Sequence, residues 1–264
     1  ILLANGTNNV TIDKNNVSLI GGTGDDTFNY AVGNLSSADI INGGTGSNTL
    51  KVTGTSAITD SMFTNVTNIQ TLDLTALSAN VTLATSADNN AALSVLLNTA
   101  GMTIDAGGFT TAISITGGAG NDVITAGSAA NTINTGNGVN SVTIASAGFN
   151  ASDVITGGIG TDTLKLTGNT VLSAANFGGI SNFETLDLSG YTGTITFGST
   201  TIPFSTVVFG ASTAIFSADA SVINGMSITG SGTVNVTNLD GAPAANLSTI
   251  TATTLNATSD GDVT

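Results

Sequence analysis

The feature that most constrains the fold is a nine-residue pattern of glycines that recurs in phase. Three copies run head to tail over residues 117–143, and the pattern also fits the stretches that begin at residues 21, 43 and 157. Each copy has glycines or small residues in its first half, Asp or Asn at the sixth place and an apolar residue at the eighth. Glycine reaches the positive-φ conformations that tight turns require. The pattern therefore predicts a stack of short strands joined by glycine-rich turns.

A longer repeat of 114 residues is superimposed on the nonapeptides. The segment Met62–Leu74 recurs as Asn176–Leu188, and Gly43–Lys51 recurs as Gly157–Lys165. Several blocks that share one offset indicate a duplicated structural unit. The predicted units are a first β-solenoid repeat over residues 1–116, a second over 117–230, and a partial, degenerate continuation over 231–264.

Between the turns, apolar and polar residues alternate over very short runs such as Thr163–Leu166 and Thr194–Phe197. Thr, Val, Ile and Phe favour the half-buried positions of a pleated sheet. Glycines every few residues keep each run below the length of an ordinary helix. We therefore expect an all-β fold with few short helices, around residues 88–98 and 171–177.

The charge composition narrows the possible functions. The chain has three Lys, no Arg and 17 acidic residues, with a net charge of −14. It has no basic patch for a phosphate backbone or an anionic membrane, so we expect no nucleic-acid partner and no membrane insertion. Cys and His are absent, which removes thiol chemistry and the commonest general base and transition-metal ligand. The chain starts at Ile1 and stops in mid-pattern at Thr264, and we interpret it as a piece of a longer protein.

The nonapeptides resemble the calcium-binding Gly-Gly-x-Gly-x-Asp-x-apolar-x repeats of the RTX (repeats-in-toxin) family. Gly117–Thr125 shows the pattern most fully, with Asp122 at the sixth place and Ile124 at the eighth. The resemblance implies a right-handed parallel β-solenoid, a β-roll or β-helix in which two nonapeptides make one coil. It also implies Ca²⁺ between stacked turns, bound by main-chain carbonyl oxygens and by the sixth-place side chain, since calcium takes six to eight oxygen ligands.

The candidate calcium ligands are the glycines, Asp and Asn of these turns. Some turns carry a carboxylate at the sixth place and others carry Asn, which offers only a neutral oxygen; the alternative for each is a tight turn without an ion. Asp39 and Asp153 precede their glycine turns by four residues and act either as ligands or as caps of a strand start. The candidates are Gly22, Gly24, Asp25, Asp26, Asp39, Gly44, Gly46, Asn48, Gly118, Gly120, Asp122, Asn131, Asn140, Asp153, Gly158, Gly160 and Asp162.

A second resemblance concerns the segments Val66–Leu74 and Ile180–Leu188. They are similar to the Asn-apolar-Glu-Thr-Leu-Asp-Leu strands that recur beside RTX motifs in bacterial surface-layer and large secreted β-repeat proteins. Gln70 replaces the usual Glu, which is present as Glu184. The resemblance implies a secreted structural component of a cell-surface array (S-layer), stabilised by Ca²⁺ and exported by type I secretion. The implied partners are other copies of the chain in a lattice and cell-surface polysaccharide, the latter through a region outside this chain.

Three other functions remain open at this point. An RTX-type adhesin or ice-binding solenoid needs a Thr ladder at constant spacing, for which the Thr-x-Thr pairs at 194–196 and 251–253 are candidates. A C-terminal secretion domain of an RTX exoprotein has the same calcium turns. An enzyme, such as a polysaccharide lyase or glycosidase, is not expected. Arg is absent, and only Asp73, Asp187 and Glu184 stand out as carboxylates for the pair that a glycosidase needs.

Overall fold

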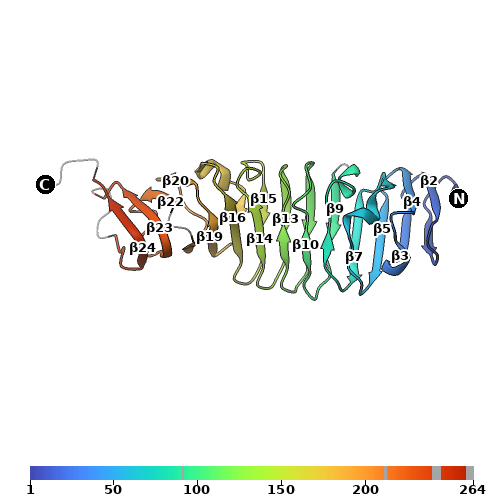
Figure 1. The fold of residues 1–264 in the computed structure, drawn as a ribbon, viewed down its shortest axis with the longest axis horizontal. Coiled ribbons are helices and arrows are strands. Elements are labelled where there is room, and N and C mark those ends of the chain that lie inside the picture. Colours follow the sequence, from blue (N-terminus) through green and yellow to red (C-terminus); the bar gives the residue numbers. More distant parts are fainter. Residues whose placement is uncertain (91, 211–212, 240–244, 260–264) are drawn as a thin grey trace.

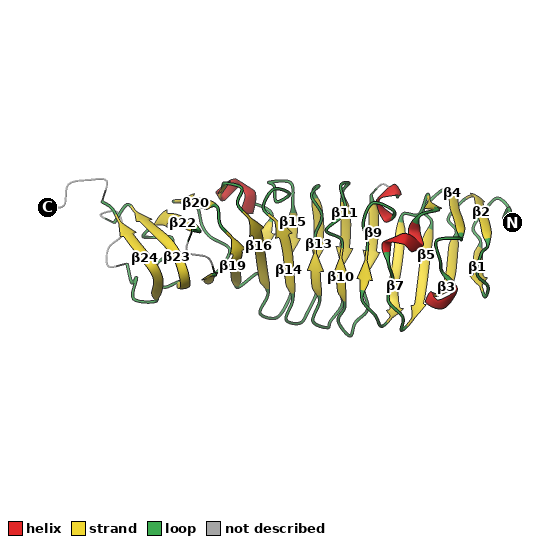
Figure 2. Cartoon of the chain, in the orientation of Figure 1, coloured by secondary structure: helices red, strands yellow, loops and turns green. Residues whose placement is uncertain are grey.

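The chain winds into a parallel β-solenoid of about 11 coils. The computed structural model describes residues 1–90, 92–210, 213–239 and 245–259. The first and last of the described strands lie at opposite ends of an elongated molecule (Figure 1). The strands cross the long axis one after another, as in a stack of rungs (Figure 2). This confirms the all-β parallel solenoid expected from the sequence.

Three parallel sheets form the walls of the solenoid. The nine-stranded sheet contains β1 (Asn9–Ile12), β3 (Thr27–Ala31), β5 (Thr49–Gly54), β7 (Thr71–Leu77), β9 (Leu93–Leu96), β11 (Ile113–Thr116), β13 (Asn131–Asn134), β15 (Val154–Thr156) and β18 (Ile180–Ser181). The three-stranded sheet contains β2 (Ser18–Thr23), β4 (Ile40–Thr45) and β6 (Val66–Thr67). The twelve-stranded sheet contains β8 (Val81–Thr82), β10 (Thr103–Asp105), β12 (Val123–Thr125), β14 (Ser141–Ala145), β16 (Thr163–Gly168), β17 (Leu172–Ser173), β19 (Thr185–Tyr191), β20 (Thr194–Gly198), β21 (Thr206–Phe209), β22 (Ile215–Asp219), β23 (Ser227–Thr237) and β24 (Ile250–Ala257).

Inward-facing apolar residues of the strands, which include the eighth-place residues of the nonapeptides, form the core. In the nine-stranded sheet they stack in register and are almost fully buried, in the order Phe28, Leu50, Leu72, Val95, Ile115, Ile133 and Ile155. The twelve-stranded sheet has a matching buried column, in the order Ile104, Ile124, Val142, Leu164, Leu186 and Val207. Each coil thus adds apolar side chains to one continuous core, which no single coil could bury alone.

The coils differ in length. Ile115 and Ile133 pair in neighbouring coils and are 18 residues apart, as two nonapeptides per coil require. Leu50 and Leu72 also pair, but they are 22 residues apart. The longer coil contains the 3-10 turn Asp60–Phe63 outside its strands. The insertion therefore lies in the connection and keeps Leu50 in register with Leu72, although the β5–β7 register shifts after Lys51.

The prediction of a short helix around residues 88–98 is wrong. Leu93–Leu96 forms strand β9, because Leu93 and Val95 alternate with Ser94 and Leu96 and join the buried face of the nine-stranded sheet. Residue 91 lies outside the described residues. Around residues 171–177 only a 3-10 turn follows the short strand β17. The four single turns are η1 (Val32–Asn34), η2 (Asp60–Phe63), η3 (Ala87–Asn89) and η4 (Ala174–Phe177).

No helix among the described residues is long and apolar enough to cross a membrane.

The two copies of the 114-residue repeat lie in different sheets. Strands β5 and β7 belong to the nine-stranded sheet, whereas their counterparts β16 and β19 belong to the twelve-stranded sheet. Both pairs carry a register shift at the same point, after Lys51 and after Lys165. The predicted unit boundaries remain a prediction; β11 ends at Thr116, and β23 spans residues 227–237.

Candidate metal centre

The sixth-place side chains of the glycine turns form hydrogen-bonded ladders between coils. In the first ladder, Oδ1 of Asp26 accepts the main-chain N–H of Asn8 at 2.9 Å, and Oδ1 of Asn48 accepts that of Asp26 at 3.0 Å. Oε1 of Gln70 continues the series by accepting the N–H of Asn48 at 2.7 Å. Asp26 and Asn48 are almost completely buried. Each sixth-place side chain therefore joins its own turn to the preceding one.

A second ladder runs through the middle of the solenoid. Oδ1 of Asp122 accepts the N–H of Met102 at 2.7 Å, and Oδ1 of Asn140 accepts that of Asp122 at 2.8 Å. Oδ1 of Asp162 accepts the N–H of Asn140 at 2.8 Å, and Oε2 of Glu184 accepts that of Asp162 at 2.7 Å. All three sixth-place residues are at most 1% exposed. This ladder carries more acidic groups than the first.

The first-place glycines leave room for this arrangement. A Cβ atom on Gly157 would stand 1.9 Å from the carbonyl oxygen of Asn182 and 2.6 Å from Oδ2 of Asp162. Gly21 and Gly117 show the same crowding against the carboxylates of their own turns. No side chain fits at these positions. Each first-place glycine therefore lets a main-chain carbonyl oxygen and a carboxylate oxygen approach one another.

The second carboxylate oxygens of Asp26, Asp122 and Asp162 have at most one hydrogen-bond donor each. Oδ2 of Asp26 is buried and has no hydrogen-bond donor. Oδ2 of Asp122 accepts only a long bond of 3.3 Å from the N–H of Gly118, and burial raises the pKa of Asp122. Oδ2 of Asp162 accepts the N–H of Gly158 at 3.0 Å. A buried carboxylate is costly unless a cation or several donors balance its charge.

These residues fit a calcium ion. Calcium binds carboxylate and carbonyl oxygens in flexible geometry. Among the described residues no three acidic side chains gather at one point, so most ligand oxygens would be main-chain carbonyls. Asp26, Asp122 and Asp162 are the side chains that would hold the ion, with carbonyl oxygens of the glycine turns around them. The ion would supply the positive charge that the buried carboxylates lack, and it would tie neighbouring coils together.

The candidate glycines stack upon one another from coil to coil. A Cβ on Gly44 would stand 2.2 Å from the carbonyl oxygen of Gly22, and one on Gly46 would stand 2.3 Å from that of Gly24. The structure therefore brings together the candidates of the turns at 21 and 43. A second stack lies in the middle of the solenoid. It begins with Gly118 and Gly120, continues through the turn at residues 135–143 and ends with Gly158 and Gly160. Asp25, in the turn that begins at residue 21, is exposed, and its Oδ1 accepts the N–H of Ser47 at 2.7 Å.

Asp39 and Asp153 lie outside these two ladders. The oxygens of Asp39 accept the N–H groups of Val17 and Ser36, both at 2.8 Å. Asp153 accepts the N–H groups of Asn131 and Asn150, also at 2.8 Å. Both carboxylates are buried and have donors on both oxygens. Of the two roles that the sequence allowed, these contacts favour the cap.

Some residues of the ladders were not among the predicted ligands. Gln70 and Glu184 accept a main-chain N–H as the sixth-place residues do, although no glycine turn precedes them. Asn90 behaves similarly, because its Oδ1 accepts the N–H of Ile69 at 2.9 Å. Gln70 and Glu184 follow Asn48 and Asp162 by one coil of 22 residues. That spacing is the signal that identifies them.

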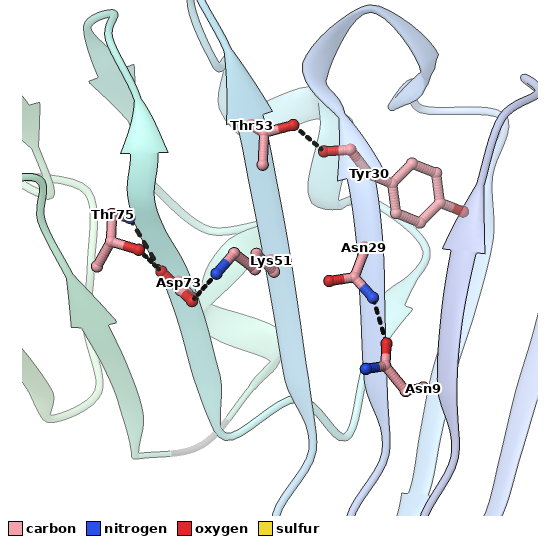
Figure 3. Close-up of polar contacts among 7 residues, drawn as sticks. All are labelled: Asn9, Asn29, Tyr30, Lys51, Thr53, Asp73 and Thr75. Carbon is pink, nitrogen blue, oxygen red and sulfur yellow. Dashed lines mark hydrogen bonds and ion pairs between the residues drawn. The ribbon is translucent and has the colours of Figure 1, made fainter.

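The outer face of the nine-stranded sheet carries a separate ion pair. Nζ of Lys51 lies 3.2 Å from Oδ2 of Asp73, whose Oδ1 accepts hydrogen bonds from the N–H and hydroxyl of Thr75 (Figure 3). Although burial opposes ionisation, the bonds from Thr75 and Lys51 lower the pKa of Asp73. Lys165 and Asp187 repeat the pair at 3.5 Å in the second copy. Both pairs lie on the sheet surface, away from the ladders.

Comparison with protein families supports the calcium assignment. The model of the RTX calcium-binding nonapeptide repeat matches four segments of the chain, residues 13–34, 36–51, 114–142 and 148–165. No curated protein and no solved structure matches the chain. RTX nonapeptide repeats bind Ca²⁺ and imply a secreted, extracellular protein, generally exported by type I secretion. The chain is therefore a parallel β-solenoid that carries calcium-binding RTX nonapeptide repeats.

Proposed function

We propose that this solenoid is a structural component of a bacterial cell-surface array, an S-layer, in which calcium stabilises the chain and promotes its assembly with further copies. The observation that carries the proposal is the burial of carboxylates between stacked turns, above all Asp26, whose second oxygen has no donor. A chain built in this way is stable where calcium is plentiful. Extracellular calcium modules bind at about 10⁻⁴–10⁻³ M, so the medium outside the cell supplies the ion and the cytosol does not.

The surface of the solenoid supports a structural role. Only 8% of the residues are charged, and the net charge is −14. Repulsion between such chains opposes close packing until divalent cations neutralise part of the charge. Calcium would thus act on both the fold and the approach of neighbouring copies. Attachment to cell-surface polysaccharide through a region outside this chain belongs to the same proposal.

The carboxylates considered for catalysis have structural partners. Asp73 and Asp187 each pair with a lysine, and Glu184 accepts the N–H of Asp162. A glycosidase needs one carboxylic acid with a raised pKa and one free carboxylate across a sugar-binding cleft. The contacts of these three residues serve the register of the coils. The proposed role is therefore not enzymatic.

A second candidate function, an adhesin or ice-binding solenoid, draws support from one column of hydroxyl groups. Half-buried to exposed residues stack in register along the nine-stranded sheet, in the order Thr27, Thr49, Thr71, Ser94, Ser114 and Thr132. The Thr-x-Thr pair at 194–196 forms no such column, because Thr194 pairs with Ile215 and Thr196 with Ser217. In the pair at 251–253, Thr251 pairs with Thr229, but Thr229 in turn pairs with Val208 and the column ends there. Beside the hydroxyl column lies the pair Lys51–Asp73. A flat two-column Thr surface is thus interrupted, and this function ranks second.

The array proposal is tested by assembly of the chain as a function of calcium. Sedimentation velocity and negative-stain electron microscopy in EGTA and in 1–10 mM CaCl₂ should show monomers without the ion and ordered two-dimensional or fibrous assemblies with it. Mg²⁺ at the same ionic strength is the control, because it prefers strict octahedral sites and retains its waters. Monomers at all calcium concentrations, together with thermal hysteresis in ice-growth assays, would favour the second candidate.

A further inference from the structure

The amide nitrogens of the sixth-place asparagines occupy a position that matches a cation site. Nδ2 of Asn8 lies 2.9 Å from the carbonyl oxygen of Ala4, 2.8 Å from that of Gly6 and 2.7 Å from Oδ1 of Asp26. The start of the chain follows a degenerate form of the nonapeptide over residues 3–11, in which Gly6, Asn8 and Val10 align with Gly120, Asp122 and Ile124. Ala4 and Gly6 stand at the second and fourth places of this turn, and Asp26 belongs to the next coil. One nitrogen is thus surrounded by two carbonyl oxygens and one carboxylate oxygen.

Asn131 repeats this arrangement in another part of the solenoid. Its Nδ2 lies 3.2 Å from the carbonyl oxygen of Gly127, 2.7 Å from that of Ala129 and 3.0 Å from Oδ1 of Asp153. The acceptors again come from the second and fourth places and from the next coil. Asn131 is completely buried, and its Oδ1 has no partner. The same three oxygens would suit a hard cation if the amide were absent.

In the other two asparagine turns Nδ2 also points at main-chain carbonyl oxygens, but with fewer contacts. Nδ2 of Asn140 contacts the carbonyl oxygens of Gly136 and Gly138, both at 3.5 Å. Nδ2 of Asn48 donates to the carbonyl oxygen of Asn68 at 3.0 Å. In all four asparagine turns the amide nitrogen therefore donates to main-chain carbonyls.

The aspartate turns lack this donor. In the asparagine turn that begins at Gly43, a Cβ on this glycine would stand 2.1 Å from the Asn68 carbonyl oxygen and 2.6 Å from Nδ2 of Asn48. In the aspartate turn that begins at Gly157, a Cβ on that glycine would stand near the Asn182 carbonyl oxygen and Oδ2 of Asp162. Near Gly157 two acceptors therefore lie close to the same point, whereas near Gly43 one donor and one acceptor do. Two acceptors need a cation or a proton between them.

From this contrast we infer that the sixth-place residue decides what fills each turn: a calcium ion where the residue is Asp, and the side chain's own amide nitrogen where it is Asn. The turns of Asp26, Asp122 and Asp162 then require the ion. The turns of Asn8, Asn48, Asn131 and Asn140 hold their carbonyl oxygens without one. This inference rests on the proposed calcium function and replaces the expectation that Asn48, Asn131 and Asn140 are ligands.

The experiment counts bound ions in the full chain by native mass spectrometry and by calorimetric titration with CaCl₂ after removal of the metal with EGTA. Asn131→Asp should add one ion to the wild-type count and lower the Tm in EGTA, with recovery in millimolar calcium. Asn8→Asp should also add one ion; it lies in the first coil and is partly exposed, so it tests the same point if Asn131→Asp does not fold. Asp122→Asn should remove one ion.

The matched control is Asn169→Asp, which adds the same charge at an exposed position outside the glycine turns and should leave the count unchanged. Asn131→Ala distinguishes two roles of the amide. If the amide takes the place of an ion, its removal leaves the ion count unchanged. If the amide is a calcium ligand, its removal lowers the count by one. Loss of one ion in Asn131→Ala, or wild-type counts in both Asn→Asp variants, overturns the inference and leaves the calcium function standing. A wild-type chain that binds no calcium overturns the calcium function itself.

Discussion

The two copies of the 114-residue repeat use the same hydrogen bonds with different charges. Asn48 and Gln70 in the first copy stand where Asp162 and Glu184 stand in the second. The four bonds that they accept from main-chain N–H groups measure 2.7–3.0 Å. An amide oxygen and a carboxylate oxygen thus serve equally well as ladder acceptors. The copies differ at the other atom of each group, which is a donor in the amide and a second acceptor in the carboxylate.

This comparison separates the shape of a turn from its dependence on an ion. The stacked glycines and the buried eighth-place residues give both copies the same path. The first copy satisfies its inner carbonyl with the amide of Asn48. In the second copy Oδ2 of Asp162 occupies the equivalent position near the Asn182 carbonyl oxygen, and the carboxylate adds a negative charge. Of these two equivalent turns, only that of Asp162 in the second copy should therefore require calcium.

The largest expected effect is that of calcium removal. Each ion bound at 100 times its Kd contributes about 2.7 kcal/mol to the free energy of unfolding. EGTA should lower the Tm, and hydrogen exchange should accelerate more over residues 154–191 than over the equivalent residues 40–77. Peptide-resolved exchange by mass spectrometry with and without 5 mM CaCl₂ measures both. Equal acceleration in the two segments would contradict the comparison.

The second effect concerns the equivalent aromatic residues Phe63 and Phe177, which are both buried. The ring of Phe177 packs edge-on against Phe149 with centroids 5.0 Å apart and also contacts Phe197 at 4.8 Å. Among the described residues, every aromatic ring pair lies in this cluster around η4. Phe→Ala costs about 3–5 kcal/mol in a core, and each lost ring pair adds about 0.5–1.5 kcal/mol.

Urea unfolding in saturating calcium should therefore show a larger loss for Phe177→Ala than for Phe63→Ala. Leucine at the same positions is the milder control, since it keeps most of the volume. A larger loss for Phe63→Ala would show that ring contacts do not distinguish the copies.

The third prediction converts one copy into the other at a single position. In EGTA, Asp162→Asn should raise the free energy of unfolding by about 1–3 kcal/mol, because it removes a buried negative charge and supplies a donor near the Asn182 carbonyl oxygen, which outweighs the lost bond from the N–H of Gly158. In calcium the same change should lower it, because an ion is lost. Asn48→Asp should give the opposite signs. Thermal unfolding by circular dichroism in both buffers measures the four differences, and equal signs in the two buffers would refute the assignment.

The fourth prediction concerns pH in the absence of calcium. Burial raises the pKa of Asp122 above 3.8, so the folded chain holds this proton more tightly than the unfolded chain. The contribution of the protonated group is fully present below pH 3.8 and is lost as the pH rises through the folded pKa. The free energy of unfolding of Asp122→Asn should therefore increase relative to that of the wild type as the pH rises across this range.

The opposite trend comes from Asp60. Burial opposes its ionisation, but the N–H groups of Ala87, Ala84 and Ser86 lower its pKa. Stability from this group is lost as the pH falls through its folded pKa. Comparing wild type with Asp122→Asn at each pH by urea unfolding in EGTA cancels the Asp60 contribution. A difference that does not change with pH would exclude a raised pKa at Asp122.

The smallest effect is expected for the surface ion pairs. The side chains of Lys51 and Lys165 are 36% and 37% exposed. Such pairs contribute about 0–1 kcal/mol and weaken with salt. Lys51→Met and Lys165→Met should each change stability by less than about 1 kcal/mol and to the same extent. A large loss in one copy alone would reveal a role beyond pairing.

The fold was largely predictable because its main signals are local. The eighth-place residues alternate with polar neighbours, so Leu50 and Ile133 were expected inside and are buried there. Leu93–Leu96 misled the helix prediction because four residues do not show whether their period is that of a strand or a helix. The ladder residues Gln70 and Glu184 depend on the length of a coil, which varies from 18 residues between Ile115 and Ile133 to 25 between Ile155 and Ile180 and follows only from the pairing of strands. Their role therefore could not be derived from the motif.

The placement of the repeats in different sheets has a consequence for how the solenoid meets its surroundings. The pair Lys51–Asp73 lies on the nine-stranded sheet, and Lys165–Asp187 lies on the twelve-stranded sheet. A ligand that recognises this surface element would find it on two walls of the rod. One molecule would then offer two attachment points on different sheets, and a ligand with two such sites could link one chain to its neighbours.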